Sequence, residues 1–256
     1  MSHLTVDREG AVALVTFDRP PVNAVDLEAI EGFRALAEEL GADAAVRAVV
    51  ITGTDRAFCA GADVSMMRDL SAENHRKVRR WIDVQAALEA MPKPVIAAIR
   101  GYALGGGAEL ALACDLRVIS ADSTIGFPEI ELGLFPGAGG TQRLPRVVGP
   151  ARALRLMMLG ERLTGEEAAA IGLADVVVPE RAGVLPAAMD LARTLAERAT
   201  RTIGLLKRAV REGFGLPIEE GLEVEETAVF ELIGTEDARE GLQAFLERRS
   251  ARFTGR

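Results

Sequence analysis

The sequence predicts an α/β protein with mainly parallel strand pairing, followed by a region made only of helices. Along most of the chain, short β-branched apolar runs alternate with stretches of helical periodicity, an order typical of parallel α/β sheets. Beyond Pro179 only helical periodicity continues, with one interruption at 213–217. We therefore divide the 256 residues into a core, 1–195, and a helical C-terminal region, 196–256.

Apolar runs and one amphipathic stretch define the first elements. Residues 11–17 are rich in β-branched apolar residues and predict a strand, and residues 46–52 predict a second one. Between them, Asp26 is placed to cap a helix over 27–41, in which apolar residues recur at helical spacing. These elements begin the alternation on which the fold class rests.

The central elements continue this alternation. Polar residues 71–80 lead into a helix over 81–90, which Pro92 ends. The next strand, 95–99, is apolar at every position, so we expect it to be buried on both faces. Another strand follows at 116–119.

Composition argues against several classes of protein. A net charge of −8 argues against a nucleic-acid-binding surface, which is usually basic. Residues 1–10 lack the apolar segment of a targeting signal, and no apolar run reaches the roughly 18 residues of a membrane span. We therefore expect a cytoplasmic protein without a membrane partner. Cys59 and Cys114 are too isolated for a disulfide framework or a zinc site and are expected to be buried.

Several common catalytic motifs are missing. The two histidines, His3 and His75, lie at the terminus and in a charged stretch, and there is no G-x-S-x-G motif. A Ser–His hydrolase is therefore not expected. The metal motifs H-E-x-x-H and C-x-x-C and the Gly-Lys-Ser/Thr of a phosphate loop are absent too, so no metal site is expected.

A short segment after the third predicted strand combines glycines with one acidic residue. Residues 104–114 read LGGGAELALAC, and apart from Glu109 this segment is apolar or small on every helical face. A helix of that kind is buried, and a buried carboxylate must be partnered or neutral. Glu109 is therefore either a structural residue, which caps a backbone or pairs with an arginine, or a functional one.

Two glycine-bearing turns offer main-chain N–H groups to a ligand. The N–H groups at the start of a helix are unpaired and lie at its positive end, which places Gly106 to donate to an oxygen that gains negative charge. The segment FCAGAD, 58–63, has the same character, and Ala62 would supply a second donor. Two such donors on one carbonyl oxygen form an oxyanion hole. The alternative for each is a tight turn that binds nothing.

A second acidic residue lies in the segment FPEIELG. Pro128 suits the first position of a helix, which places Glu129 in the first turn, where the helix dipole favours a carboxylate for structural reasons alone. Glu131 is a competing candidate that would face a different direction. The glycine-rich loop that follows, 135–142, would let a ligand or a partner chain approach closely.

Three of these segments, in this order, resemble the enoyl-CoA hydratase/isomerase, or crotonase, family. They read AFCAGADVSMM, GYALGGGAELALACDLRV and FPEIELGLFPGAGGTQRLPRVVG, and the similarity extends over essentially the whole chain. The resemblance implies a spiral of ββα units followed by a helical trimerisation region, assembled as a homotrimer or a homohexamer. It also implies that Ala62 and Gly106 hold the thioester oxygen of an acyl-CoA.

Within this family, two glutamates are typical of members that hydrate a 2-enoyl thioester, and both are present here. The resemblance implies that Glu129 exchanges the proton at C2 and that Glu109 holds the attacking water, so that 2-trans-enoyl-CoA becomes 3-hydroxyacyl-CoA. CoA is part of the substrate, and no further cofactor is implied. The alternatives are a double-bond isomerase that uses Glu129 alone, another acyl-CoA lyase of the family, or a non-catalytic scaffold that binds CoA or RNA.

The resemblance also indicates residues along the CoA. A first group would line its pantetheine and adenine, largely through the backbone: Ala60, Ala62, Asp63, Val64 and Ser65. Phe245 and Arg248 match positions that reach the CoA of a neighbouring subunit, although helix packing for Phe245 and a solvated face for Arg248 are the favoured explanations. Four residues near the expected acyl chain are assigned to core packing rather than to the pocket: Met66, Met67, Trp81 and Phe135.

Overall fold

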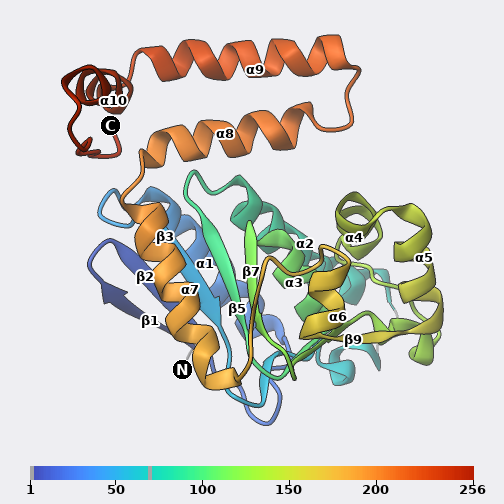
Figure 1. Cartoon of the computed structure of the whole chain (residues 1–256). Coiled ribbons are helices and arrows are strands. Elements are labelled where there is room, and N and C mark those ends of the chain that lie inside the picture. Colours follow the sequence, from blue (N-terminus) through green and yellow to red (C-terminus); the bar gives the residue numbers. More distant parts are fainter. Residues whose placement is uncertain (1–2, 69–70) are drawn as a thin grey trace.

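The computed structural model of the chain describes residues 3–68 and 71–256, in which two sheets form the core (Figure 1). The larger sheet has the order β1 (Leu4–Glu9), β2 (Val12–Phe17), β3 (Ala48–Thr52), β5 (Val95–Ile99), β7 (Leu116–Ser120) and β10 (Val176–Val178). The smaller sheet has the order β4 (Ala57–Cys59), β6 (Tyr102–Leu104), β8 (Thr124–Gly126) and β9 (Arg162–Thr164). Neighbouring strands are parallel except β1 with β2 and β8 with β9. The predicted α/β class with mainly parallel pairing is confirmed.

From β3 to β8, successive strands alternate between the two sheets. β3, β5 and β7 belong to the larger sheet, and the strand that follows each of them, β4, β6 or β8, belongs to the smaller one. Helix α2 (Ala72–Ala90) follows β4, and α3 (Gly106–Ala113) follows β6. Since β4, β6 and β8 are parallel neighbours, their carboxyl ends lie at one edge of the smaller sheet.

Helices cover both faces of the larger sheet (Figure 1). α7 (Arg181–Ala196) packs on one face, toward which Ile96 and Ala98 of β5 point. α1 (Leu27–Ala42), α2 and α3 pack on the other face, where the remaining residues of β5 point. β5 is thus buried at every position, as its unbroken apolar sequence predicts.

The last three helices lie outside these layers. α8 (Thr200–Gly213) and α9 (Ile218–Ile233) form an antiparallel hairpin, and α10 (Glu236–Glu247) follows at its open end (Figure 1). The shorter helices complete the chain: η1 (Val64–Arg68), η2 (Pro128–Leu132), α4 (Gly140–Val148), α5 (Pro150–Leu159) and α6 (Gly165–Ala170). Among the residues with a described placement, no helix has both the length and the apolar character that a membrane crossing requires.

Some local predictions are confirmed in detail. The carboxylate of Asp26 accepts a hydrogen bond from the N–H of Ala29 at 2.8 Å and so caps α1, as the sequence indicates. Cys59 and Cys114 are buried free thiols, and burial raises the pKa of each to about 12. Both cysteines therefore act as small apolar residues rather than as nucleophiles.

Other elements differ from the prediction. Residues 71–80 do not merely precede a helix, because α2 already begins at Ala72. The first half of α2 is charged and largely exposed, so it lacks the apolar period by which a helix is found in a sequence. The sequence also did not predict β1 or the strands of the smaller sheet. Those four strands have 3 residues each, too few to show an alternating pattern.

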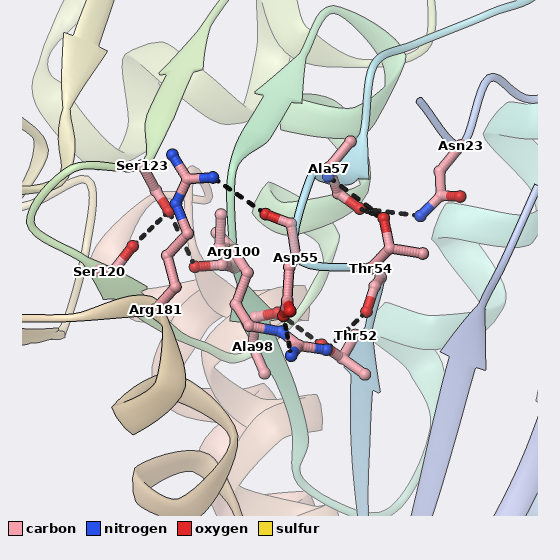
Figure 2. A network of polar contacts seen from close by, with 12 residues as sticks. Asn23, Thr52, Thr54, Asp55, Ala57, Ala98, Arg100, Ser120, Ser123 and Arg181 are labelled. Atoms are coloured by element: carbon pink, nitrogen blue, oxygen red, sulfur yellow. Dashed lines mark hydrogen bonds and ion pairs between the residues drawn. The ribbon is translucent and has the colours of Figure 1, made fainter. Parts of the chain in front are cut away.

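A network of polar contacts holds the loops at the carboxyl ends of β3 and β5 (Figure 2). Thr52 Oγ1 donates to the carbonyl of Ala98 at 3.0 Å and joins the two strands. Arg100 forms an ion pair with Asp55, and Arg181 at the start of α7 donates to the main-chain carbonyl of Asp55 at 3.1 Å. These contacts fix the loop between β3 and β4, and with it the start of the smaller sheet.

Asn23 is the buried residue of this region whose loss should destabilise the fold most. Its φ is 56°, and its Nδ2 donates to the carbonyls of Phe17 and Ala57, each at 2.8 Å. Figure 2 shows the contact with Ala57. We expect Asn23→Ala to lower the free energy of unfolding by about 2–4 kcal/mol, because two buried carbonyls each lose one donor and alanine disfavours this backbone conformation. Urea-induced unfolding measures the change.

The neighbouring Thr54 provides the control for this prediction. Its hydroxyl donates to the carbonyl of Ala57 and accepts from the N–H of Ala57, each at 3.4 Å. Hydrogen bonds of this length are weak. Thr54→Val should change the free energy of unfolding by less than about 1 kcal/mol. If the Asn23→Ala protein were as stable as the Thr54→Val protein, the role given to Asn23 would be wrong.

Candidate active site

Three turns meet at the edge of the smaller sheet where β4, β6 and β8 end. The loop 60–65 follows β4, the turn at Gly105 follows β6, and η2 follows β8. Parallel pairing of the three strands brings these turns side by side. With the first turn of α3, they carry the groups that the sequence indicates: Ala62, Gly106, Glu109 and Glu129.

The main-chain N–H of Ala62 points away from Val25, whose main chain holds the loop after β4. The N–H of Val25 donates to the carbonyl of Gly61, and the N–H of Asp63 donates to the carbonyl of Val25, each at 2.8 Å. Because successive main-chain groups of an extended segment alternate in direction, the Ala62 N–H faces the opposite side. Gly106 lies close by, since a methyl group on it would be 3.5 Å from the Ala62 nitrogen.

The N–H of Gly106 is free because it opens a helix. Gly105 precedes it with φ 53° and ψ −123°, a conformation open essentially to glycine, and Gly106 is the first residue of α3. Trp81 Nε1 donates to the carbonyl of Gly106 at 3.2 Å and holds this residue in place. Within the part of the chain that the structure describes, neither this N–H nor that of Ala62 donates to a protein acceptor, and both residues are partly exposed. Two adjacent free N–H groups can hold one ligand oxygen.

Glu109 is buried beside these donors, with 2% of its surface exposed. Its Oε1 accepts hydrogen bonds from the N–H groups of Ala138 and Gly140, each at 2.8 Å. Burial raises the pKa of Glu109, and the two N–H groups and the charge of Arg143 oppose that rise. The expectation that Glu109 caps a backbone is thus confirmed for one oxygen. Among the described residues Oε2 has no hydrogen-bond donor, so it is available to a ligand.

Glu129 lies in the first turn of η2, with Pro128 at the first position as predicted. It is half-buried, and its Oε2 is buried without a hydrogen-bond partner among the described residues. Burial raises the pKa of Glu129 to about 7, and the nearby charge of Glu109 adds to the rise. A methyl group on Gly105 would lie 3.1 Å from Glu129 Oε1, so this carboxyl group borders the turn that precedes Gly106.

The competing acidic residue, Glu131, faces elsewhere. It is exposed and forms an ion pair with Arg162 at 2.8 Å on the outer side of η2. Glu129 and Glu131 are two positions apart in η2, and in so narrow a helix this spacing turns one carboxylate toward the site and the other toward solvent. Glu109 and Glu129 are the acidic pair of this edge.

Comparison with known proteins assigns the family. The family model for enoyl-CoA hydratase/isomerase matches residues 7–256 of the chain. The chain belongs to the enoyl-CoA hydratase/isomerase family. The resemblance of the three motif segments to this family is thereby confirmed.

Named relatives and solved structures of this family match along the whole chain. A probable enoyl-CoA hydratase of Bacillus subtilis (strain 168) is 38% identical, with 100% of both chains covered. The crotonyl-CoA hydratase of Syntrophomonas wolfei is 38% identical over 98% of this chain and 97% of its own. The crystal structure of an enoyl-CoA hydratase from Bacillus anthracis superposes with a TM-score of 0.94 at 36% identity, covering 99% and 100% of the two chains.

The residues assigned to CoA from the family resemblance lie along the loop after β4. Ala60 is partly exposed, and Val64 and Ser65 are exposed, so all three are open to a ligand. The carboxylate of Asp63 is instead engaged by the N–H of Ser65 at 3.0 Å and by Arg19 at 2.9 Å. Hydrogen bonds from Ser65 and then Arg19 lower the pKa of Asp63. The side chain of Asp63 therefore shapes this loop.

Phe245 and Arg248 lie at the end of α10, far from the turns of the smaller sheet within one chain (Figure 1). Phe245 is 82% exposed, so packing against its own chain does not explain it. Arg248 ends α10 in the left-handed conformation with φ 56° and is exposed. A contact of either residue with CoA requires a second copy of the chain.

The residues assigned to core packing behave differently from one another. Trp81 is 4% exposed and belongs to the core beside α3, as expected. The assignment is wrong for Phe135, which is 71% exposed, because its loop lies at the surface beyond η2. Met66 is half-buried in η1, and the side chain of Met67 lies outside the described residues.

Several groups at this site were missed in the sequence. The glycine-rich loop 135–142 was expected to let a ligand or a partner chain approach closely, and the contact of its main chain with Glu109 through Ala138 and Gly140 was not expected. The only signal for this role is the high glycine content, which permits a close backbone contact without naming its partner. Arg143, which holds the same loop, carried no signal beyond its charge.

Proposed function

We propose that the chain hydrates 2-trans-enoyl-CoA to 3-hydroxyacyl-CoA and is an enoyl-CoA hydratase. The observation that carries this proposal is the convergence of two free main-chain N–H groups, of Ala62 and Gly106, with two buried or half-buried carboxyl groups, of Glu109 and Glu129. Relatives that match over nearly their whole length are named hydratases, which supports the same activity.

The two N–H groups would hold the thioester oxygen. When water adds to C3, negative charge develops on that oxygen as an enolate, and donors that are already aimed at it stabilise the charge without reorganisation. Each donor of such a pair typically contributes about 3 kcal/mol to the lowering of the barrier. Ala62 and Gly106 have this arrangement because adjacent parallel strands, β4 and β6, deliver their turns to the same edge.

Burial raises the pKa of both carboxyl groups, but their hydrogen-bond partners differ. Glu129 has an unpartnered oxygen and a pKa raised to about 7, so its protonated form is available as the acid that delivers a proton to C2. Burial raises the pKa of Glu109 as well, but the two N–H bonds that it accepts oppose this rise, which suits it better than Glu129 to be the base that holds the attacking water. This division of roles agrees with that implied by the family resemblance.

A panel of thioesters tests the proposal. We expect the purified protein to consume 2-trans-enoyl-CoA and to form 3-hydroxyacyl-CoA, with chain length deciding the rate. Turnover of 3-enoyl-CoA with little addition of water would instead identify a double-bond isomerase that uses Glu129 alone. Binding of acyl-CoA without turnover of any member of the panel would identify a non-catalytic scaffold. Both outcomes contradict the hydratase.

The pH dependence of hydration is expected to follow the raised pKa of Glu129. Since that pKa is about 7, the protonated acid is lost as pH rises through this value. We therefore expect kcat to fall about tenfold per pH unit on the alkaline side. Stopped-flow measurement of kcat across the neutral range checks this. A kcat that stays constant or rises with pH would contradict the role of Glu129 as acid.

The CoA part of the substrate would run along the loop after β4. Val64 and Ser65 are exposed there and Ala60 is partly exposed, and the three would contact pantetheine and adenine, largely through the main chain. Phe245 and Arg248 would add contacts from a neighbouring copy. The proposed reaction adds one water, whose hydroxyl bonds to C3 while C2 gains a proton from Glu129 and the water gives up a proton to Glu109. These acid–base steps need no metal and no cofactor besides the CoA that the substrate carries.

We also propose that 1–195 forms a spiral of ββα units and that 196–256 assembles the chain into a homotrimer or a homohexamer. A groove of about 440 Å³ runs between α8 and α9. Large apolar side chains are exposed on the three terminal helices and on the connection between α8 and α9: Leu206, Val210, Phe214, Ile218, Phe230, Ile233, Leu242 and Leu246. So much exposed apolar surface is typical of an interface. Light scattering should give the mass of three or six copies, and a monomer would contradict the assembly.

A further inference from the structure

We propose that Arg143 is a positioning residue for Glu109, acting through the loop 136–140 whose N–H groups hold that carboxylate. The inference rests on the proposed function, in which Glu109 holds the attacking water. It concerns a contact between α2 and α4 in which the contacting residues, Glu89 and Arg143, are 54 positions apart in the sequence.

The loop presents two sides to different side chains. On one side, the N–H groups of Ala138 and Gly140 donate to Glu109 Oε1, each at 2.8 Å. On the other side, the carbonyl of Ala138 accepts from Arg143 Nη1 at 3.0 Å, and the carbonyl of Gly139 accepts from the Arg143 main-chain N–H at 2.8 Å. The bond to the Gly139 carbonyl is a main-chain bond of α4, and this carbonyl shares a peptide plane with the Gly140 N–H. The guanidinium of Arg143 holds the Ala138 carbonyl, which belongs to the peptide between the two donors, and so restrains the loop that carries both.

Arg143 is itself held by two residues of α2. Its Nε and Nη2 donate to the two carboxylate oxygens of Glu89, each at 2.7 Å, and its Nη1 donates to Gln85 Oε1 at 2.7 Å. A bidentate pair of this kind fixes direction as well as distance. Glu89 and Gln85 are four residues apart on α2, so both face α4. The guanidinium thus connects a rigid helix to the loop.

Two further observations agree with this role. Gly139 has φ 108°, and a methyl group on it would lie 2.0 Å from Arg143 Nη1, so the guanidinium occupies the space directly against the loop. Arg143 also acts on Glu109 by charge: burial raises the pKa of Glu109, and the positive charge of Arg143 opposes the rise. Arg143 is therefore expected to set both the orientation and the ionisation of Glu109 without contacting the substrate.

Arg143→Gln tests the proposal through the pH profile of hydration. Glu109 must be ionised to act as base, so activity is lost as pH falls through its pKa, and loss of the Arg143 charge raises that pKa. We expect the acid limb of kcat/KM to move to higher pH than in the wild-type protein. We also expect kcat to fall about 10- to 100-fold and KM to stay within about twofold, because the N–H donors lose their direction.

Three variants control this experiment. Arg146→Gln removes an exposed arginine of the same helix, which donates to the carbonyl of Gln142, and should leave kcat and the acid limb unchanged. Arg143→Lys keeps the charge but not the bidentate geometry, so it should lower kcat while restoring the acid limb. Glu89→Gln should lower kcat without moving the acid limb of the pH profile to higher pH. If Arg143→Gln does not fold, wild-type kcat in both Arg143→Lys and Glu89→Gln overturns the proposal.

The outcomes separate this inference from the proposed function. If Glu109→Gln retains hydration, the role of Glu109 fails, and the positioning of Glu109 by Arg143 fails with it. If Glu109→Gln is inactive but Arg143→Gln has the acid limb and kcat of Arg146→Gln, only the inference about Arg143 is overturned. A drop in thermal stability of Arg143→Gln with a wild-type pH profile likewise identifies a purely structural residue.

Discussion

Glu109→Gln and Glu129→Gln are each expected to lower kcat for hydration of a 2-enoyl-CoA by about 10²- to 10⁴-fold. Glutamine keeps the size of each side chain but provides neither a base nor an acid. Because Glu109 Oε1 only accepts hydrogen bonds, a glutamine oxygen can keep the contacts with Ala138 and Gly140, so the fold should be retained. Initial rates with purified variants, together with their unfolding curves, measure both effects.

Glu131→Gln is the matched control for this pair. Glu131 lies in the same short helix as Glu129 but is exposed and paired with Arg162, so its loss should change kcat by less than about twofold. Near-normal turnover in Glu109→Gln or in Glu129→Gln would contradict the acid–base roles. If Glu131→Gln lowered kcat as much as Glu129→Gln does, the assignment of Glu129 as the acid would be wrong.

Gly106→Ala is expected to lower kcat/KM by about 10²- to 10³-fold, as much as the loss of one oxyanion donor, although alanine keeps the main-chain N–H. A methyl group on Gly106 would lie 3.5 Å from the Ala62 nitrogen and 3.3 Å from Trp81 Nε1. The fold can accept these contacts with a small adjustment. The carbonyl oxygen of a thioester, however, must come within about 3.1 Å of both nitrogens, and the methyl group would crowd that position.

Two other glycines define the limits of this experiment. Gly41→Ala in α1 meets no atom within 4 Å and should leave activity unchanged, with stability equal or slightly higher. Gly107→Ala places a methyl group 1.9 Å from the carbonyl of Cys59, which the closely packed turn cannot accept, so little folded protein is expected. Full activity of a folded Gly106→Ala protein would contradict the oxyanion hole.

The elements that the sequence predicts well are those with a long apolar pattern. β5 appears at the predicted residues, and α1 begins at the predicted cap, because a continuous apolar run and an N-terminal aspartate are local signals. The smaller sheet, whose edge carries the candidate site, was not predicted, since its 3-residue strands have no period to detect. The turns after those strands were found instead from their glycines.

The candidate site follows the same division. Glu109 stands out because it is the one charged residue in an apolar helix, and Gly106 because it opens that helix. The groups that hold Glu109 could not be found in this way. A main-chain N–H, such as that of Ala138 or Gly140, has no residue signature, and its contact with Glu109 spans 29 or 31 residues of sequence. Such contacts depend on how α3 and α4 pack.

The central claim concerns where a thioester oxygen binds, and a crystal structure with an unreactive acyl-CoA analogue tests it most directly. We expect that oxygen at about 2.7–3.1 Å from the main-chain nitrogens of both Ala62 and Gly106, with the carboxyl groups of Glu109 and Glu129 facing the adjacent carbons. A thioester oxygen bound away from these two nitrogens, or acyl carbons out of reach of both carboxyl groups, would contradict the account.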